Sequence, residues 1–175
     1  MDSQHCEQTV KRLASLDWWK HRTVELAVAL AISTGVVQVA GIVSWRQKEL
    51  TAPNAWMAVR EIYVPDFPYD TRPDMVYDRE IRENFNGYWI VEVQRKTTNG
   101  LWSTSCSGSG LNEYDPSEVI PNNTVSWPWF IGKDCVVEPG VYRLKVSYSM
   151  TRPNWPEKRL QAISNEFKVT APEKT

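Results

Sequence analysis

The sequence predicts one N-terminal transmembrane helix followed by an all-β domain. The first observation is an apolar stretch at residues 26–45 that carries no formal charge. The second is that, after residue 50, short segments alternate apolar and polar residues without a long amphipathic helical pattern. The third is the composition, since 11 Pro and 8 Gly in 175 residues indicate many turns and short strands.

The apolar stretch reads LAVALAISTGVVQVAGIVSW. An α-helix of about 20 residues is about 30 Å long, which matches the hydrocarbon core of a bilayer. Trp18 and Trp19 precede the stretch and Trp45 ends it, so we expect these rings to anchor the helix at the two membrane interfaces. We therefore predict a transmembrane helix over residues 24–45. The alternatives are a buried core helix and a cleaved signal peptide, although the run is long and late for a signal peptide.

The basic residues around the helix favour a cytoplasmic N-terminus. They are Lys11, Arg12, Lys20 and Arg22 before the helix, and Arg46 and Lys48 after it. Residues 1–23 also carry apolar residues at helical spacing, which predicts an amphipathic segment on the cytoplasmic surface or a continuation of the membrane helix. The expected location is the cell (inner) membrane, with the C-terminal domain in the periplasm or outside the cell.

One side of the helix combines small and polar residues, which favour close approach and hydrogen bonding between membrane helices. These residues are Ala27, Ala31, Thr34, Gly35, Gln38 and Gly41. We interpret them as a packing face for self-association or for another membrane subunit. The alternative is that Ala and Gly are simply common in membrane helices.

Residues 46–55 are expected to form a linker, and residues 56–175 the extracytoplasmic β domain. The alternation of Tyr142, Leu144 and Val146 with polar residues predicts a strand over 141–150. Further strands are predicted within 56–64, 88–97, 101–106 and 163–170. Asn99-Gly100 predicts a hairpin with a type I′ turn between two of these strands.

The segment PGVYRLKVSYSM, followed by SNEFKVT, resembles the last two strands of immunoglobulin-like and fibronectin-type-III-like sandwiches. Residues 139–142 resemble the corner at which a Tyr locks the loop before the penultimate strand. The resemblance implies an immunoglobulin-like β-sandwich. The chain departs from antibody-type domains at Leu144, where those domains have a Cys, so their inter-sheet disulfide is absent.

Cys106 and Cys135 are the cysteines that follow the membrane helix, and we expect them to form a disulfide in an oxidising compartment. Two unrelated thiols are the alternative. Cys6 lies on the other side of the helix and is expected to stay reduced. Residues 107–134 are rich in Ser, Gly, Asn and Pro, so the interval is expected to be weakly structured, with Ser107–Gly110 as a flexible linker.

Two local features remain as candidate binding sites. Trp127, Trp129 and Phe130 surround a proline, and they predict either a plug at one end of the sandwich or an exposed recognition loop. Four aspartates recur every fourth residue from Asp66 to Asp78 among three prolines. We interpret that stretch as a solvated loop, with weak cation binding as the alternative.

The composition argues against several functional classes. Both histidines precede the membrane helix, so the β domain has no His for acid–base catalysis or for an ordinary zinc site. The net charge of -1 argues against nucleic acid as a partner. We predict no catalytic residues, no metal site and no cofactor. The expected function is a membrane-anchored interaction protein, such as an accessory subunit. Alternatives are a receptor module for a glycan or peptide, and a virus- or phage-encoded membrane protein.

Overall fold

The computed structural model describes the backbone of residues 3–120 and 123–171, and the side chains from residue 24 onward within those ranges. The chain divides into two compact units, Met1–Lys48 and Glu49–Thr175.

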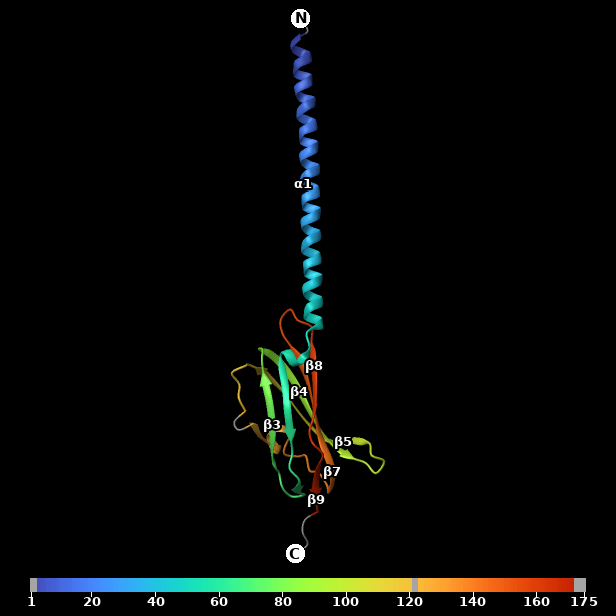
Figure 1. Ribbon diagram of the computed structural model, residues 1–175, viewed down its shortest axis with the longest axis vertical. Helices are drawn as coiled ribbons and strands as arrows, with labels where there is room; N and C mark the ends of the chain where they lie inside the picture. The colour runs from blue at the N-terminus through green and yellow to red at the C-terminus, as the bar shows by residue number, and fades with distance from the viewer. Residues whose placement is uncertain (1–2, 121–122, 172–175) are drawn as a thin grey trace. The chain divides into compact units, whose positions relative to one another are not determined.

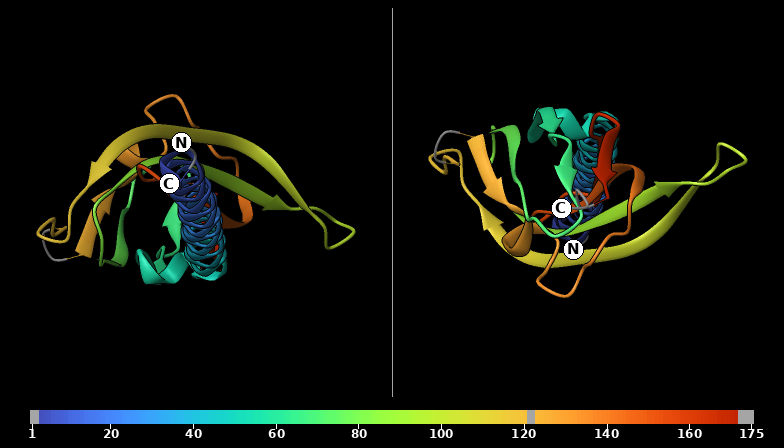
Figure 2. Two further views of the ribbon diagram at one scale, coloured as in Figure 1. Left: turned by 90° about the horizontal axis from the view of Figure 1, so that it is seen from above. Right: turned by 90° about the horizontal axis from the view of Figure 1, so that it is seen from below.

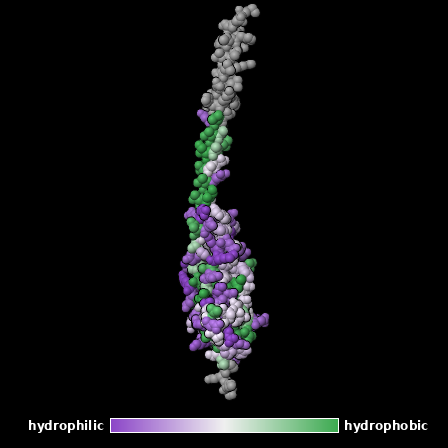
Figure 3. Space-filling model, turned by 90° about the vertical axis from the view of Figure 1, so that its right-hand side faces the viewer, coloured by the Kyte–Doolittle hydropathy of each residue, from purple (hydrophilic) through white to green (hydrophobic). Residues whose placement is uncertain are grey.

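The first unit belongs to one continuous helix, α1 (Ser3–Leu50). Its part from Val24 to Leu50 is long and apolar enough to cross a membrane, and none of its most apolar window is buried. On the face seen in Figure 3, hydrophobic residues make up most of the described part of this helix. A core helix of a soluble domain would instead be largely covered.

The helix continues past Trp45, so the expected linker 46–55 is helical in its first half. Arg46 to Leu50 are residues with good helix propensity, which explains the extension. Pro53 opens a single 3₁₀ turn, η1 (Pro53–Ala55). A proline disfavours the helical conformation of the residue before it, so the helix stops just ahead of this point.

The second unit is a β domain with two sheets (Figure 1). Its elements are β1 (Met57–Tyr63), β2 (Phe67–Pro68), β3 (Asp74–Ile81), β4 (Phe85–Lys96), β5 (Trp102–Tyr114), β6 (Thr124–Ser126), α2 (Trp127–Phe130), β7 (Gly140–Thr151), β8 (Lys158–Ile163) and β9 (Phe167–Thr170). The smaller sheet has the order β1-β3-β6, and the larger has the order β2-β9-β7-β4-β5, with β8 also paired to β7. Among the strands of the described residues, β2 and β9 are paired in parallel and the other pairs are antiparallel.

The strands expected from alternation are confirmed at β1, β4, β7 and β9. In β7 every second residue from Tyr142 to Met150 is buried, as the pattern requires. In β9 Phe167 and Val169 are buried while Lys168 is exposed. The inward residues of both sheets form one hydrophobic core. Across this core the hydroxyls of Tyr77 and Tyr148 are hydrogen-bonded to each other.

The hairpin at Asn99-Gly100 is confirmed, but the prediction of a type I′ turn is wrong. Gly100 has a left-handed backbone with φ +76°, whereas Asn99 does not. The amide of Thr97 bonds to the carbonyl of Leu101, and the amide of Gly100 bonds to the carbonyl of Thr97. This is a three-residue loop that ends in a left-handed glycine, so only one residue needs positive φ.

The expectation of a weakly structured interval after Cys106 is wrong for its first part. β5 continues to Tyr114, so Ser107–Gly110 lies inside this strand. Figure 2 shows the whole of β5 as a long curved strand. Its serines point to solvent, and its glycines are needed on the inner face. A Cβ on Gly108 would lie 2.7 Å from the carbonyl oxygens of Phe130 and Ile131, and one on Gly110 would lie 2.7 Å from the Trp89 ring. The glycines therefore make room for close packing.

Candidate functional site

The short helix α2 separates the three aromatics of the predicted recognition loop. Ser126 precedes it in an extended conformation, and Pro128 lies in its first turn, where a proline is well tolerated. Trp127 is 1% exposed and Phe130 is 3% exposed, whereas Trp129 is 59% exposed. The helix thus places two aromatic rings in the core and one at the surface.

Trp127 and Phe130 act as the plug that the sequence offered as one interpretation. The Trp127 ring packs edge-on against Phe67, with ring centroids 5.4 Å apart. The Phe130 ring lies 5.2 Å from Tyr77 and 5.3 Å from Trp89. A recognition loop made of all three aromatics is therefore wrong, because two of them are covered by the domain's own core.

Trp129 remains available at the surface. Its ring stacks on the buried Trp89 at 6.3 Å with an interplanar angle of 27°, and on Phe130 at 6.2 Å. Trp89 in turn lies over Gly110 of β5, its partner across the β4–β5 ladder. The exposed indole is thus supported by a rigid stack, which limits the rotamer entropy that an aromatic binding residue loses on contact.

A pocket with a volume of about 340 Å³ opens beside Trp129. It is lined by Arg79, Asn112, Glu118, Val119, Ile120, Thr124, Val125, Ser126 and Trp129, and is called the Trp129 pocket below. Its volume lies at the lower end of the range for small-ligand sites, about 300–1,000 Å³. Val119 is 77% exposed, so an apolar side chain and the exposed indole both border the opening.

Arg79 provides the charge of the Trp129 pocket. Its side chain is only 8% exposed, and its guanidinium lies 4.9 Å from the centre of the Tyr114 ring. Its Nη2 donates to Oε2 of Glu118 at 3.1 Å, while Nε is buried without a hydrogen-bond partner among the described residues. Arg79 therefore has one carboxylate partner through one nitrogen, although the guanidinium fork can hold a carboxylate with two.

Glu118 belongs to an exposed loop that is ordered by local hydrogen bonds. Its amide donates to the Asp115 carbonyl at 2.9 Å. The Asp115 carboxylate accepts the amide of Ser117 at 2.8 Å and its hydroxyl at 2.6 Å. These bonds hold the pKa of Asp115 below its usual value. Glu118 itself is 40% exposed, so its carboxylate lies at the rim of the Trp129 pocket.

The tyrosines behind Arg79 stay neutral. Burial raises the pKa of Tyr77 well above its ordinary value, and the neighbouring Tyr148 raises it further. Burial also raises the pKa of Tyr148 and of Tyr114. Phenols with raised pKa values hold their protons at neutral pH, and the hydroxyls of Tyr77 and Tyr148 are hydrogen-bonded to each other.

The predicted packing face of α1 is exposed throughout. The Thr34 hydroxyl donates to the carbonyls of Leu30 at 2.8 Å and Ala31 at 3.0 Å, so it is satisfied within the helix. The Gln38 amide has no hydrogen-bond partner among the described residues. Ala27, Gly35 and Gly41 lie open on the same helix surface.

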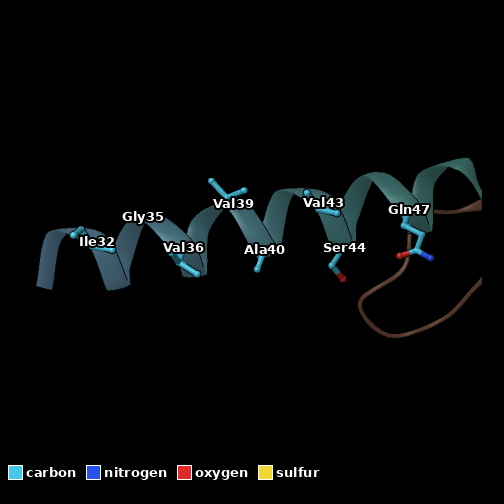
Figure 4. Close-up of a pocket in the computed structure, with 8 residues that line it drawn as sticks. All are labelled: Ile32, Gly35, Val36, Val39, Ala40, Val43, Ser44 and Gln47. Carbon is cyan, nitrogen blue, oxygen red and sulfur yellow. The ribbon is translucent and has the colours of Figure 1, made fainter. Parts of the chain in front are cut away.

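A shallow groove also runs along the described part of α1, from Ile32 to Gln47 (Figure 4). Figure 4 shows Val36, Ala40 and Ser44, spaced by four, pointing to one side. The groove shares only Gly35 with the predicted packing face. Trp45 is 50% exposed, and the side chains of Trp18 and Trp19 lie outside those that are described.

A disulfide joins Cys106 to Cys135, as predicted, with the two Cα atoms 5.8 Å apart. Cys106 lies within β5 and not at the end of a strand, because β5 extends beyond it. Cys135 is buried and follows α2 along the chain. The disulfide thus ties the segment after α2 to the strand that carries Gly108.

The four aspartates do not share one loop. Asp66 lies just before the parallel strand pair β2–β9, and its Oδ1 accepts a hydrogen bond from the amide of Lys168 at 2.6 Å. Asp70 is exposed, and Asp74 and Asp78 lie in β3, where a strand replaces the expected solvated loop. Within the described side chains, no three His, Cys, Asp or Glu residues gather into a group able to hold a metal ion.

Comparisons of this chain with models of protein families, with curated proteins and with solved structures find no match.

Sequence reasoning missed Arg79, Glu118, Asn112 and Val119. The available signal was the alternation of Met75, Tyr77, Arg79 and Ile81, in which the arginine occupies an inward position of β3. A buried arginine between aromatics needs a partner, so it marks a site. The nearby aspartates and prolines obscured this alternation.

Proposed function

We propose that this chain is a single-pass membrane protein without enzymatic activity, which presents an immunoglobulin-like domain outside the cytoplasm and serves as an interaction subunit of a larger membrane assembly. The observation that carries the proposal is the long apolar helix, none of whose most apolar window is buried. A surface of this kind is stable only when lipid or another protein covers it.

The strand order supports an immunoglobulin-like sandwich. The larger sheet, β2-β9-β7-β4-β5, has the order expected for A′, G, F, C and C′ strands of a variable-type domain, and β1-β3-β6 fits the A, B and E strands. The parallel pairing of β2 with β9 fits an A′ strand beside G. Trp89, buried on β4, fits the core tryptophan of strand C.

The corner before β7 gives further support. The Tyr142 hydroxyl donates to the carbonyl of Glu138 at 2.8 Å, which is the hydrogen bond of a tyrosine corner. The disulfide differs from the antibody type, because Cys106 lies on β5 and Cys135 in the segment after α2. It therefore ties a loop to a sheet instead of joining the two sheets.

The packing face of α1 is the proposed dock for the membrane partner, either a second copy or another subunit. The Gln38 amide supports this role, because an amide side chain surrounded by hydrocarbon is stabilised by a hydrogen bond to a neighbouring helix. The test is gentle solubilisation followed by identification of co-purifying proteins and of the oligomeric state. Gly35→Leu and Gln38→Leu should each reduce assembly, whereas Val36→Leu, on the opposite side of the helix, should not. Unchanged assembly in both variants would make the helix only an anchor.

The proposed orientation places the N-terminus in the cytoplasm and the disulfide in an oxidising compartment. Protease added outside sealed spheroplasts should then digest the β domain of the intact chain. A thiol-reactive probe that does not cross membranes should label Cys6 only after lysis. Labelling of Cys6 in intact cells would reverse the orientation.

A second candidate function is a receptor module for a peptide or glycan, and the Trp129 pocket favours it. The supported, 59% exposed indole at the edge of a pocket is the arrangement that binding hot spots use. Trp129→Ala should then weaken partner capture by the β domain, while Leu101→Ala, at the exposed β4–β5 hairpin, should leave it unchanged. Equal capture by both variants would remove this function.

A further inference from the structure

The Trp129 pocket combines a buried cation with an apolar wall. The Arg79 guanidinium lies 4.9 Å from the centre of the Tyr114 ring, and its Nη2 donates to the Glu118 carboxylate at 3.1 Å. Val119, Ile120 and Trp129 line the same pocket. A group that suits both parts carries a carboxylate directly beside an apolar side chain.

Glu118 occupies the position that such a carboxylate would take. It reaches Arg79 from an exposed loop, and it makes a single contact at 3.1 Å. A ligand carboxylate that enters from the pocket can take over this single contact with the guanidinium, and a guanidinium that gains a second N–H contact holds a carboxylate more strongly. Its charge would replace that of Glu118, so Arg79 would not be left buried and unpaired during the exchange.

We propose that the Trp129 pocket binds an apolar carboxylate, such as the C-terminal residue of a peptide with an aromatic side chain, which displaces Glu118 from Arg79 and packs its side chain against Trp129. Glu118 is then an internal competitor that occupies the pocket in the free protein. The inference rests on the second candidate function and names the chemistry of its ligand. The same chemistry occurs in a free aromatic acid, so both sources are included in the test.

The test measures binding to the full-length chain in lipid nanodiscs by isothermal titration calorimetry. The probes are acetyl-Gly-Gly-Phe with a free terminal carboxylate, the same peptide as a terminal amide, and N-acetylphenylalanine. The free-carboxylate peptide should bind, and the amide should bind at least 10-fold more weakly. Binding of the free acid with the peptide's affinity identifies a small acid as sufficient, whereas weaker binding of the free acid identifies the peptide terminus. Equal binding of the acid and amide peptides would overturn the proposal, as would the absence of binding by all probes.

The variants separate competition from simple loss of structure. Glu118→Gln should tighten binding of the free-carboxylate peptide on the order of 5-fold, because it removes the competing charge. Glu113→Gln, an exposed carboxylate outside the pocket, should change nothing. Trp129→Ala should weaken binding at least 10-fold, and its exposure makes loss of folding a minor concern.

Arg79→Lys keeps the charge and loses the fork, so it should also weaken binding. A Glu118→Gln variant that binds more weakly than the natural chain would refute the competitor role. Loss of all peptide binding while a membrane partner still co-purifies would refute this inference alone and leave the proposed assembly function standing.

Discussion

Removing the Cys106–Cys135 disulfide should destabilise the β domain by an amount that follows from the loop it closes. The two cysteines are 29 residues apart in the sequence. Closing a loop of about 30 residues lowers the entropy of the unfolded chain by about 12 cal/mol/K, which corresponds to about 3.5 kcal/mol at 25 °C. A domain of this size has an unfolding entropy of about 0.27 kcal/mol/K, so the expected loss in Tm is about 13 °C.

The assay is thermal unfolding of the full-length chain in detergent, followed by near-ultraviolet circular dichroism. The natural chain is compared with and without a reductant, and with the double variant Cys106→Ala/Cys135→Ala. Cys6→Ala is the matched control and should leave Tm unchanged. A loss in Tm below about 3 °C on reduction would refute the loop argument, and free thiols at both positions in unreduced protein would refute the pairing itself.

Three further predictions concern the β domain and use the same unfolding assay. Gly108→Ala should lower the free energy of unfolding by about 1–3 kcal/mol, because its new methyl would meet two main-chain carbonyl oxygens at 2.7 Å. Ser109→Ala, at the neighbouring solvent-facing position, should change the free energy of unfolding by less than about 0.5 kcal/mol. Equal Tm values for the two variants would contradict the packing argument. Tyr142→Phe removes the hydrogen bond to the Glu138 carbonyl and should lower stability by about 0.5–1.5 kcal/mol, whereas the same change at the exposed Tyr63 should have no measurable effect. In the folded protein the pKa values of Tyr77, Tyr148 and Tyr114 lie above the unfolded value of about 10. The neutral phenols therefore contribute stability that is complete below about pH 10 and is lost as the pH rises through the folded-state pKa values. Tyr77→Phe should make the free energy of unfolding fall less steeply with alkaline pH, and an unchanged slope would count against this explanation.

The sequence predicted the elements whose signals are local. The uncharged run of α1 and the alternation in β7 are each visible in one stretch of chain, and the cysteine pairing follows from there being two cysteines after the helix. The strands β2, β3, β6 and β8 were missed. β3 combines inward Met75 and Tyr77 with a buried arginine and outward aspartates, so its hydrophobic alternation is incomplete.

The Trp129 pocket could not be predicted because its parts come from distant segments. Arg79 comes from β3, Glu118 from the loop after β5, and Trp129 from α2. Whether each aromatic of residues 127–130 is buried depends on the one-turn helix, which turns Trp127 and Phe130 inward and leaves Trp129 outside. No local pattern distinguishes the three rings, since all are large, apolar and adjacent to Pro128.

The bare inner face of β5 has a consequence for how this chain can change in evolution. Gly108 accepts the main chain of the segment after α2, and Gly110 accepts the ring of Trp89. A larger residue at position 110 is therefore compatible only with a smaller one at position 89, so substitutions at these two positions should occur in pairs among related chains. At position 108 the neighbouring atoms belong to the main chain, so no substitution of a side chain can make room for a larger residue. That glycine should persist wherever the disulfide and the one-turn helix persist, and should become free to vary in lineages that have lost both.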